Sequence, residues 1–539
     1  MNRPPEERAP VAVLGCLGAL AVVAALLALH ATRHGVSYFG DSGAYLGMAE
    51  NLRHGHGLTL PFDLPFDRFT PLQAFEFHGA VPSTHFPPGY PLALTLFSPP
   101  GVAVTTGARV LGCVLVAANV VLSARLTARL LPRSQQWFQL ATPVLLIGVS
   151  GQPVGFLLLH AELGSEALFI TALLSTLLLA CRYFDEPSAR RLAALTTAAA
   201  VAVLTRNVGL FLLVLLVPAI ALVGARPNRA RIGGAVAFAG GAVAPWVAFL
   251  VYGRILGGGS EGSGLDQVVY HPLTGTFADL MNVAGSWIVS PDAASAVHGV
   301  ALLAVGGFVA IGLWIGFRPP SSTTARSTAL ALAAVFVYAA FVLWSQTFID
   351  AGIPTNDRLF APIRPVVTAL FVAAFAAVTA RIPTAMSRAL LVVVVAAAVV
   401  PGWRDQRDLV RIYAAPAHGY PELASIRNAP RSTLIESPNA DVVMLAIHRN
   451  AISTARPVVP VTNRRNPCFE RDLAENAALL DYYGGYAYFS AGRYQITDAT
   501  TPAELGRLVH LVPVSTQPTG MVFRVARVPG AAAPRPLAC

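Results

Sequence analysis

Six charged residues whose side chains could carry out a group transfer stand at the edges of apolar segments: Asp41, Glu162, Glu166, Arg206, Arg358 and Arg364. A carboxylate can take the proton from an attacking hydroxyl, and an Arg guanidinium grips phosphate through two parallel donors. A charge at the centre of a bilayer costs ~2.5–3.5 kcal/mol on insertion scales, so we expect these side chains to face water or a polar cavity. The alternative is that the acids cap helices and the arginines snorkel to the interface.

The stretch GDSGAYLGMAENLRHGHGL over 40–58 predicts a short amphipathic helix beside the first apolar segment. Asp41 or Ser42 can cap it, and the apolar residues Tyr45, Met48 and Leu52 recur at helical spacing. Glycines at 55 and 57 would end it. We expect the helix to lie along the membrane surface, with Asp41 where the chain leaves the bilayer. A plain helix cap is the competing explanation for Asp41.

Histidine is concentrated in the same region, since six of the twelve histidines fall between His30 and His85. No motif of the HExxH kind occurs there, so we assign no metal ligands; a divalent ion bound by this loop is the alternative. His85 precedes the tract PPGYP, where Pro87 and Pro88 stop any helix. Of these histidines, His85 is the one that we expect to contact substrate, because it lies beside this tract.

Three further motifs place charge at membrane edges. HAELGSEALF puts Glu162 and Glu166 four residues apart, which predicts one helix face. LTRNVGLFLLV puts Arg206 at the outer end of a short apolar segment, and NDRLFAPIRP puts Arg358 and Arg364 at the start of another.

The composition is that of a membrane protein, with 55% hydrophobic and only 12% charged residues among 539, against about a quarter charged in soluble domains. A span needs ~20 apolar residues. The first apolar segment, 11–29, could be a signal peptide, but it is longer than the apolar core of a signal peptide and lacks a clean cleavage site. About eleven segments qualify: 11–29, 103–124, 137–158, 163–181, 192–204, 208–224, 232–252, 298–317, 327–347, 361–380 and 389–403.

The positive charges indicate the orientation of these spans. The net charge is +10 and the sequence has no lysine, so all 38 basic residues are arginine; this bias is typical of a GC-rich bacterial genome. The arginines gather in alternate short loops, which follows membrane topology and argues against nucleic-acid binding. We expect a bacterial cytoplasmic membrane protein with its N-terminus inside and the tail outside.

The same pattern predicts two domains. Residues 1–403 form the membrane part, with a long external loop over 32–101 and a Gly-rich, mobile external loop within 253–297. Residues 404–539 alternate strand-like and helical runs, which predicts a small external α/β domain. An external position would allow Cys468 and Cys539 to pair. Its DYYGGYAYF run is either a packed core strand or an aromatic surface for sugar.

The loop motifs in combination resemble the GT-C superfamily, in which an acid after the first span begins a long external loop followed by a tract like this PPGYP. These are polytopic glycosyltransferases that use polyprenyl-phosphate sugars, such as protein O-mannosyltransferases, lipid A aminoarabinose transferases and actinobacterial arabinosyl- and mannosyltransferases. The resemblance covers roughly residues 10–400 and implies a mostly α, polytopic GT-C-like bundle.

The resemblance also implies roles. Asp41 would be the catalytic base; Arg206, Arg358 and Arg364 would bind the donor phosphate; and Tyr45, His85, Glu162 and Glu166 would contact substrate. The reaction would invert the sugar carbon and transfer arabinofuranose, mannose or a similar sugar to a glycan, lipid or protein acceptor outside the membrane. Two alternatives stay open: a transporter or flippase for a lipid-linked or anionic substrate, and a polysaccharide polymerase or ligase of another membrane fold.

Overall fold

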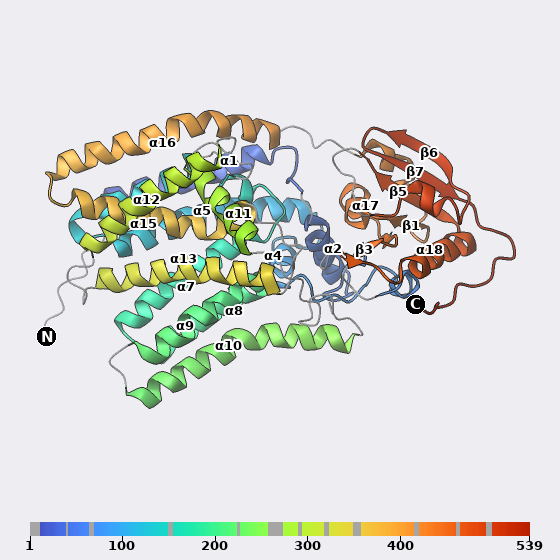
Figure 1. Ribbon diagram of the computed structural model, residues 1–539, viewed down its shortest axis with the longest axis horizontal. Helices are drawn as coiled ribbons and strands as arrows, with labels where there is room; N and C mark the ends of the chain where they lie inside the picture. Colours follow the sequence, from blue (N-terminus) through green and yellow to red (C-terminus); the bar gives the residue numbers. More distant parts are fainter. Residues whose placement is uncertain are drawn as a thin grey trace.

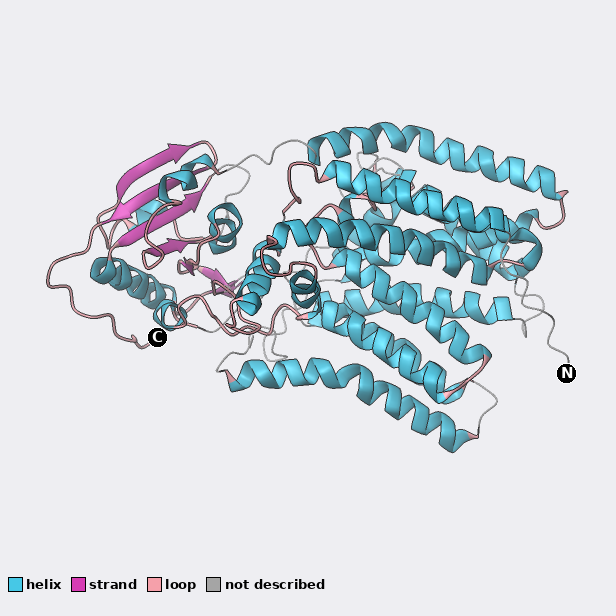
Figure 2. Cartoon of the chain, turned by 180° about the vertical axis from the view of Figure 1, so that it is seen from behind, coloured by secondary structure: helices cyan, strands magenta, loops and turns pink. Residues whose placement is uncertain are grey.

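The computed structural model of the chain describes residues 11–38, 41–63, 69–148, 155–223, 227–256, 273–288, 294–316, 323–348, 357–413, 420–459, 464–491 and 499–539. A bundle of long helices forms one part of the molecule, and a small sheet with its helices lies at one end of that bundle (Figure 1). Figure 2 shows the same division from behind, with every strand gathered beyond the ends of the long helices. The Gly-rich stretch 257–264 of the loop expected to be mobile lies outside the described residues, whereas residues 273–286 of the same loop form helix α11.

Among the described residues, each of the eleven predicted apolar segments contains a helix. These helices are α1 Val11–Ala31, α5 Val104–Leu130, α6 Ala141–Gly148, α7 Glu166–Asp185, α8 Ala189–Thr205, α9 Phe211–Leu222, α10 Asn228–Ile255, α12 Ser295–Gly316, α13 Thr323–Phe348, α15 Arg364–Thr379 and α16 Thr384–Tyr413. Among the described residues, seven helical stretches are long and apolar enough to cross a membrane: α1, α5, α7, α10, α12, α13 and Arg358–Thr379. The protein is therefore a multi-pass membrane protein.

Two of the expected segments differ in length from the helices that occupy them. The segment 137–158 contains the 3-10 helix η1 Arg133–Leu140 and then α6, which ends at Gly148 after eight residues. That helix is about 12 Å long at 1.5 Å per residue, too short to span a bilayer by itself. Helix α16 continues to Tyr413, beyond the boundary expected after residue 403.

Ion pairs show which helix ends lie together at each end of the bundle. At one end of the bundle, Asp185 at the end of α7 pairs with Arg129 at the end of α5 (2.8 Å) and with Arg326 at the start of α13 (3.9 Å). At the opposite end, the first residue of α7, Glu166, pairs with Arg206, which follows α8. Charged residues therefore lie at both ends of the apolar helices, and the alternation inferred from arginine placement fits these contacts.

Small residues let the helices pack closely, as α1 and α5 show. The buried positions of α1 include Val13, Leu17, Ala21, Ala24 and Ala28, which recur every three or four residues along one stripe that faces α5. The other face of α1 keeps large apolar side chains exposed, among them Leu26 at 58%. A soluble helix would not expose such a face, and a lipid-facing helix does.

The long loop over 32–101 contains three short helices among its described residues, α2 Ser42–Arg53, α3 Pro71–Glu76 and α4 Gly89–Leu96. Glycines at 55 and 57 take left-handed backbone angles (φ 82° and 74°) just after α2, as expected for residues that end a helix. Gly89 lets α4 approach the end of α8, because an added Cβ would lie 2.7 Å from the carbonyl oxygen of Leu204. The PPGYP tract therefore packs the start of α4 against Leu204, two residues before Arg206.

The C-terminal part is the predicted α/β domain. A five-stranded sheet has the order β2-β1-β5-β7-β6, with β1 parallel to β2 and β5, and β7 antiparallel to β5 and β6. Its elements are η7 Pro421–Ile426, β1 Leu434–Ser437, α17 Ala440–Ile447, β2 Ile452–Ser453, α18 Phe469–Tyr483, β5 Gly485–Ser490, α19 Pro502–Leu505, β6 Val512–Gln517 and β7 Gly520–Val525, with a β3–β4 ribbon of Val458–Val459 and Arg464–Arg465. Remaining short elements are η2 Leu158–His160, η3 Asn207–Leu210, α11 Leu273–Ser286, α14 Asp357–Phe360 and η6 Ala361–Ile363.

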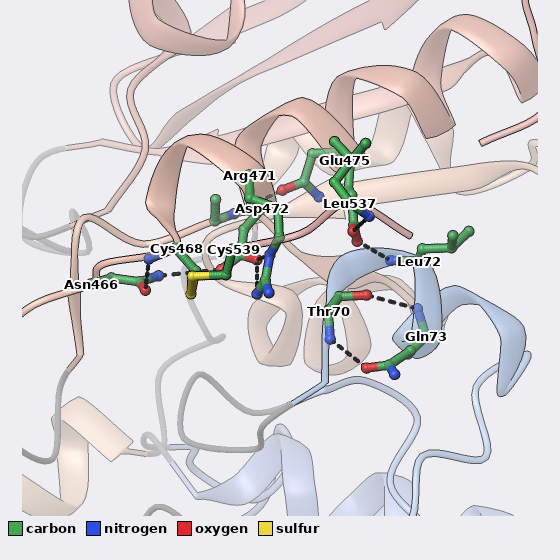
Figure 3. Close-up of polar contacts among 12 residues, drawn as sticks. Thr70, Leu72, Gln73, Asn466, Cys468, Arg471, Asp472, Glu475, Leu537 and Cys539 are labelled. Atoms are coloured by element: carbon green, nitrogen blue, oxygen red, sulfur yellow. Dashed lines mark hydrogen bonds and ion pairs between the residues drawn. A yellow bond between two sulfur atoms is a disulfide. The ribbon is translucent and has the colours of Figure 1, made fainter. Parts of the chain in front are cut away.

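Polar contacts fasten the first loop and the C-terminal end to α18 (Figure 3). The carboxylate of Glu475 is 1% exposed and accepts from the backbone N–H of Leu72 in α3 (3.4 Å) and of Leu537 (3.0 Å). Cys468 and Cys539 form a disulfide, so the pairing considered from the sequence is present. Tyr488 of β5 is fully buried, which favours the core-strand explanation of the DYYGGYAYF run.

Candidate active site

Asp41 occupies the N-cap position of α2 but does not act as its cap. Its side chain makes no hydrogen bond to the helix N-terminus and is 36% exposed. Capping therefore does not explain this carboxylate, and its side chain is directed to a different partner. Nη2 of Arg358, in α14, donates to Oδ2 of Asp41 at 3.1 Å.

Glu166 is the centre of the charge cluster. It is the first residue of α7 and is 1% exposed. Its Oε1 lies 2.6 Å from Nη1 of Arg206 and 2.6 Å from Nε of Arg358. A carboxylate this deeply buried is tolerated because two guanidinium groups compensate it. Glu166 thus holds two arginines from distant parts of the chain side by side.

A hydrogen bond from α13 holds the segment that carries Arg358. The hydroxyl of Tyr338, which is fully buried, donates to the backbone carbonyl of Leu359 at 2.6 Å. The Tyr338 ring packs edge-on against Phe211 and Phe360. Because the residue next to Arg358 is fixed in this way, the guanidinium is presented to Asp41 and Glu166 from a defined position.

Tyr45 joins the cluster through Ser165. Its hydroxyl lies 2.9 Å from Ser165 Oγ, which also accepts from Nη1 of Arg206 at 3.0 Å. The Tyr45 ring is packed edge-on between Phe86 and Tyr90. Burial raises the pKa of Tyr45 well above its ordinary value, so the hydroxyl stays protonated and acts as a neutral hydrogen-bonding group.

His85 lies within electrostatic reach of Asp41, although burial dominates its titration. Desolvation lowers the pKa of His85 to about 4, and the Asp41 charge opposes that shift. The imidazole is therefore neutral at physiological pH. Its ring packs edge-on against Phe86, and its backbone carbonyl accepts from the Asn207 amide, next to Arg206, at 3.5 Å.

Glu162 lies differently from the sequence expectation, whereas Arg364 stands at the start of an apolar helix as expected. Helix α7 begins only at Glu166, so Glu162 and Glu166 do not share a helix face; that prediction is wrong. The backbone at Glu162 instead forms a parallel bridge with Ser37, because Gly164 and Ser165 turn the chain before the helix starts. Arg364 is the first residue of α15 and is 5% exposed. The two ion pairs described above for Glu166 are made by Arg206 and Arg358.

One residue near Asp41 was not anticipated from the sequence. Asp441, at the start of α17 in the α/β domain, packs against Gly43: a Cβ added to Gly43 would lie 2.9 Å from that of Asp441. Burial raises the pKa of Asp441 to about 6, Arg456 lowers it and the Asp41 charge raises it further. Since 400 positions separate the two aspartates, nothing in the sequence around DVVML predicts this contact. The α/β domain thus places a carboxylate beside the membrane site.

The histidine-rich loop was also considered as a site for a divalent ion. Within the described part of the chain, no three His, Cys, Asp or Glu side chains are grouped closely enough to hold an ion. His54, at the end of α2, lies 2.7 Å through Nδ1 from the Glu50 carbonyl of its own helix.

Comparison with known proteins identifies the fold. No protein-family model matches the sequence, and no curated protein matches it. Among solved structures, the chain is similar to ArnT from Cupriavidus metallidurans bound to undecaprenyl phosphate, with 15% identity, a TM-score of 0.55, and coverage of 98% of this chain and 100% of that one. It is also similar to ArnT from the same organism in the apo state, with 14% identity, a TM-score of 0.57, and coverage of 95% of this chain and 98% of that one. This chain therefore shares the fold of ArnT, which agrees with the polytopic helical bundle expected from the GT-C resemblance.

Proposed function

We propose that the protein is a membrane glycosyltransferase that transfers a sugar from a polyprenyl-phosphate donor to an acceptor hydroxyl outside the membrane. The observation that carries the proposal is the bridge made by Arg358, whose Nη2 contacts Asp41 and whose Nε contacts Glu166. A potential base and a potential phosphate ligand are thus adjacent at one end of a GT-C bundle.

The charges of the cluster suit this chemistry. Asp41 and Glu166 carry two negative charges, and Arg206 and Arg358 carry two positive ones. A phosphate that approaches the guanidinium groups would compete with the carboxylates for their donors, and Arg is suited to bind it through parallel hydrogen bonds. Glu166 is the more deeply buried acid, so we assign it to holding the arginines and Asp41 to proton transfer.

The proposed reaction runs in one displacement. Asp41 takes the proton of the acceptor hydroxyl, whose oxygen then attacks the anomeric carbon of the donor. The bond between that carbon and the phosphate oxygen breaks, and polyprenyl phosphate leaves with the electron pair. Arg206 and Arg358 would stabilise the charge that develops on the leaving phosphate. One base suffices, and the sugar carbon is inverted.

The orientation and the substrates also belong to this proposal. We place the N-terminus in the cytoplasm and both the cluster and the α/β domain outside. The sugar is arabinofuranose, mannose or a similar sugar, and the acceptor is a glycan, lipid or protein. The alternative that required another membrane fold is disfavoured by the likeness to ArnT, and the transporter alternative stays to be tested.

The test uses full-length protein purified in detergent, polyprenyl phosphates that carry arabinofuranose or mannose, and an extract of envelope glycans and lipids as acceptor. Mass spectrometry should detect free polyprenyl phosphate in step with sugar transfer to the extract. In proteoliposomes without acceptor, the transporter alternative predicts movement of the intact donor between leaflets. Such movement, with no release of polyprenyl phosphate when acceptor is added, would contradict the proposal.

A further inference from the structure

A second candidate binding site lies at the end of the bundle opposite Asp41. A cavity of about 170 Å³ opens between η1 and the turn that joins α15 to α16. Helix α15 begins at Arg364, near the charge cluster, and ends at Thr379, beside this cavity. Its lining residues are Pro132, Ser134, Gln135, Trp137, Phe138, Ala380, Ile382, Thr384, Ser387 and Arg388. At about 30 Å³ for each water molecule, the cavity has room for a small polar group.

Gln135 supplies a buried acceptor that lacks a donor. The residue is 9% exposed, and its Nε2 donates to the Ala376 carbonyl at 3.1 Å. This bond fixes the amide orientation, and Oε1 has no hydrogen-bond partner among the described residues. Buried polar atoms are nearly always satisfied, so a hydroxyl or ammonium group from a bound molecule would complete the site.

Arg388 supplies a cation at the rim of the same cavity. Its guanidinium carbon lies 6.0 Å from the centre of the Trp137 ring, within the range of a cation–π contact. The side chains of Ser134 and Thr384 add hydroxyl groups to the lining. A molecule that satisfies both Arg388 and Gln135 needs a negative charge and a hydrogen-bond donor close together.

The position of the cavity favours a lipid over a soluble anion. Tryptophan and arginine at the end of membrane helices are typical of headgroup depth. Helix α16 leads away from the cavity with exposed apolar side chains: Met386 is 60%, Leu390 is 42% and Val393 is 62% exposed. Acyl chains attached to a headgroup in the cavity would have this surface to lie against.

We propose that this cavity binds the headgroup of an anionic phospholipid that carries a free hydroxyl, such as phosphatidylglycerol. The phosphate contacts Arg388, and a glycerol hydroxyl donates to Oε1 of Gln135. The site is separate from the proposed glycosyl-transfer centre, and it lies on the side expected to be cytoplasmic.

The experiment is native mass spectrometry of the full-length protein released from bilayers that contain phosphatidylglycerol, phosphatidic acid or phosphatidylcholine. Phosphatidylglycerol should be retained over phosphatidylcholine, and retention should fall about tenfold in Arg388→Gln, which loses one charged contact. Gln135→Met should lower retention of phosphatidylglycerol but not of phosphatidic acid, which has no free glycerol hydroxyl. The control is Arg381→Gln, an exposed arginine of the same turn that does not line the cavity.

The same measurement can overturn the proposal. Equal retention of phosphatidylglycerol by the parent and Arg388→Gln, or no preference over phosphatidylcholine, would exclude a headgroup site. Displacement of bound phosphatidylglycerol by millimolar glycerol phosphate would assign the cavity to a soluble phosphate ester and contradict the lipid assignment. Because Arg388 is exposed, its substitution is expected to leave the fold intact.

Discussion

Arg358 and Asp41 are separated by 317 positions in the sequence, and their side chains are joined by a hydrogen bond of 3.1 Å. The same guanidinium reaches the buried Glu166 through Nε at 2.6 Å. This one side chain therefore connects the loop after α1, the start of α7 and the segment before α15.

Arg358→Lys should raise the KM for the polyprenyl-phosphate donor about tenfold or more. Lysine offers one point charge, so it cannot hold Asp41 and Glu166 and also present parallel donors to phosphate. Donor saturation kinetics on purified protein measure the effect. Arg254→Lys is the matched control, since Arg254 is an exposed arginine at the end of α10. Unchanged donor kinetics in Arg358→Lys would reduce Arg358 to an interfacial anchor.

Glu166→Gln should destabilise the protein by about 3–5 kcal/mol, because it leaves two guanidinium groups without their buried counter-charge. Thermal unfolding in detergent would show a large drop in Tm. Glu186→Gln serves as the comparison: that carboxylate is 54% exposed and pairs with Arg191, so its loss should cost about 0–1 kcal/mol. A drop of equal size in both variants would contradict the bridging role of Glu166.

Asp441→Asn should change how stability depends on pH. Burial raises the pKa of Asp441 from 3.8 to about 6, so the folded state binds a proton more tightly than the unfolded chain does. The stability that this tighter proton binding gives to the folded state is fully present below about pH 4 and is lost as the pH rises through 6. Asparagine does not ionise, so the variant does not lose this stability at high pH. Its Tm should therefore exceed that of the parent at pH 7.5, and the difference should be much smaller at pH 4.5. An equal difference at the two pH values would argue against a buried, titrating Asp441.

The topology can be tested at the outer sheet. Thr516 is exposed in β6, and a cysteine there should react with a membrane-impermeant maleimide in intact cells, in a background where Cys16, Cys113 and Cys181 are replaced. External placement agrees with the Cys468–Cys539 disulfide, which persists in oxidising compartments. Labelling that requires permeabilised cells would reverse the predicted orientation.

Much of this arrangement could be predicted because membrane helices leave a strong signal. Each of the eleven apolar segments corresponds to a helix, since a bilayer forces every spanning backbone to satisfy its own hydrogen bonds. Asp41, Glu166, Arg206 and Arg358 were selected because charge at a membrane edge is costly without a partner. The structure brings those four together.

The failures have physical causes as well. Glu162 was placed on the helix of Glu166 by spacing alone, but Gly164 and Ser165 delay the helix start. The segment 137–158 is treated as one span, although Gly151, Gln152 and Pro153 interrupt its apolar run and proline breaks a helix. The end of α6 at Gly148 could therefore be anticipated from the sequence. Asp441 was missed because its contact with Gly43 depends on how the α/β domain docks against α2, and no local pattern encodes docking.

The most direct test of the central claim is the turnover of Asp41→Asn. Asparagine keeps the size of the side chain and can still accept from Arg358, but it cannot take a proton from the acceptor. We predict that sugar transfer from a polyprenyl-phosphate donor falls by ~10²–10⁴, with donor binding and thermal unfolding near those of the parent. Near-parental turnover in the purified variant would contradict Asp41 as the base and, with it, the account of the cluster as a glycosyl-transfer site.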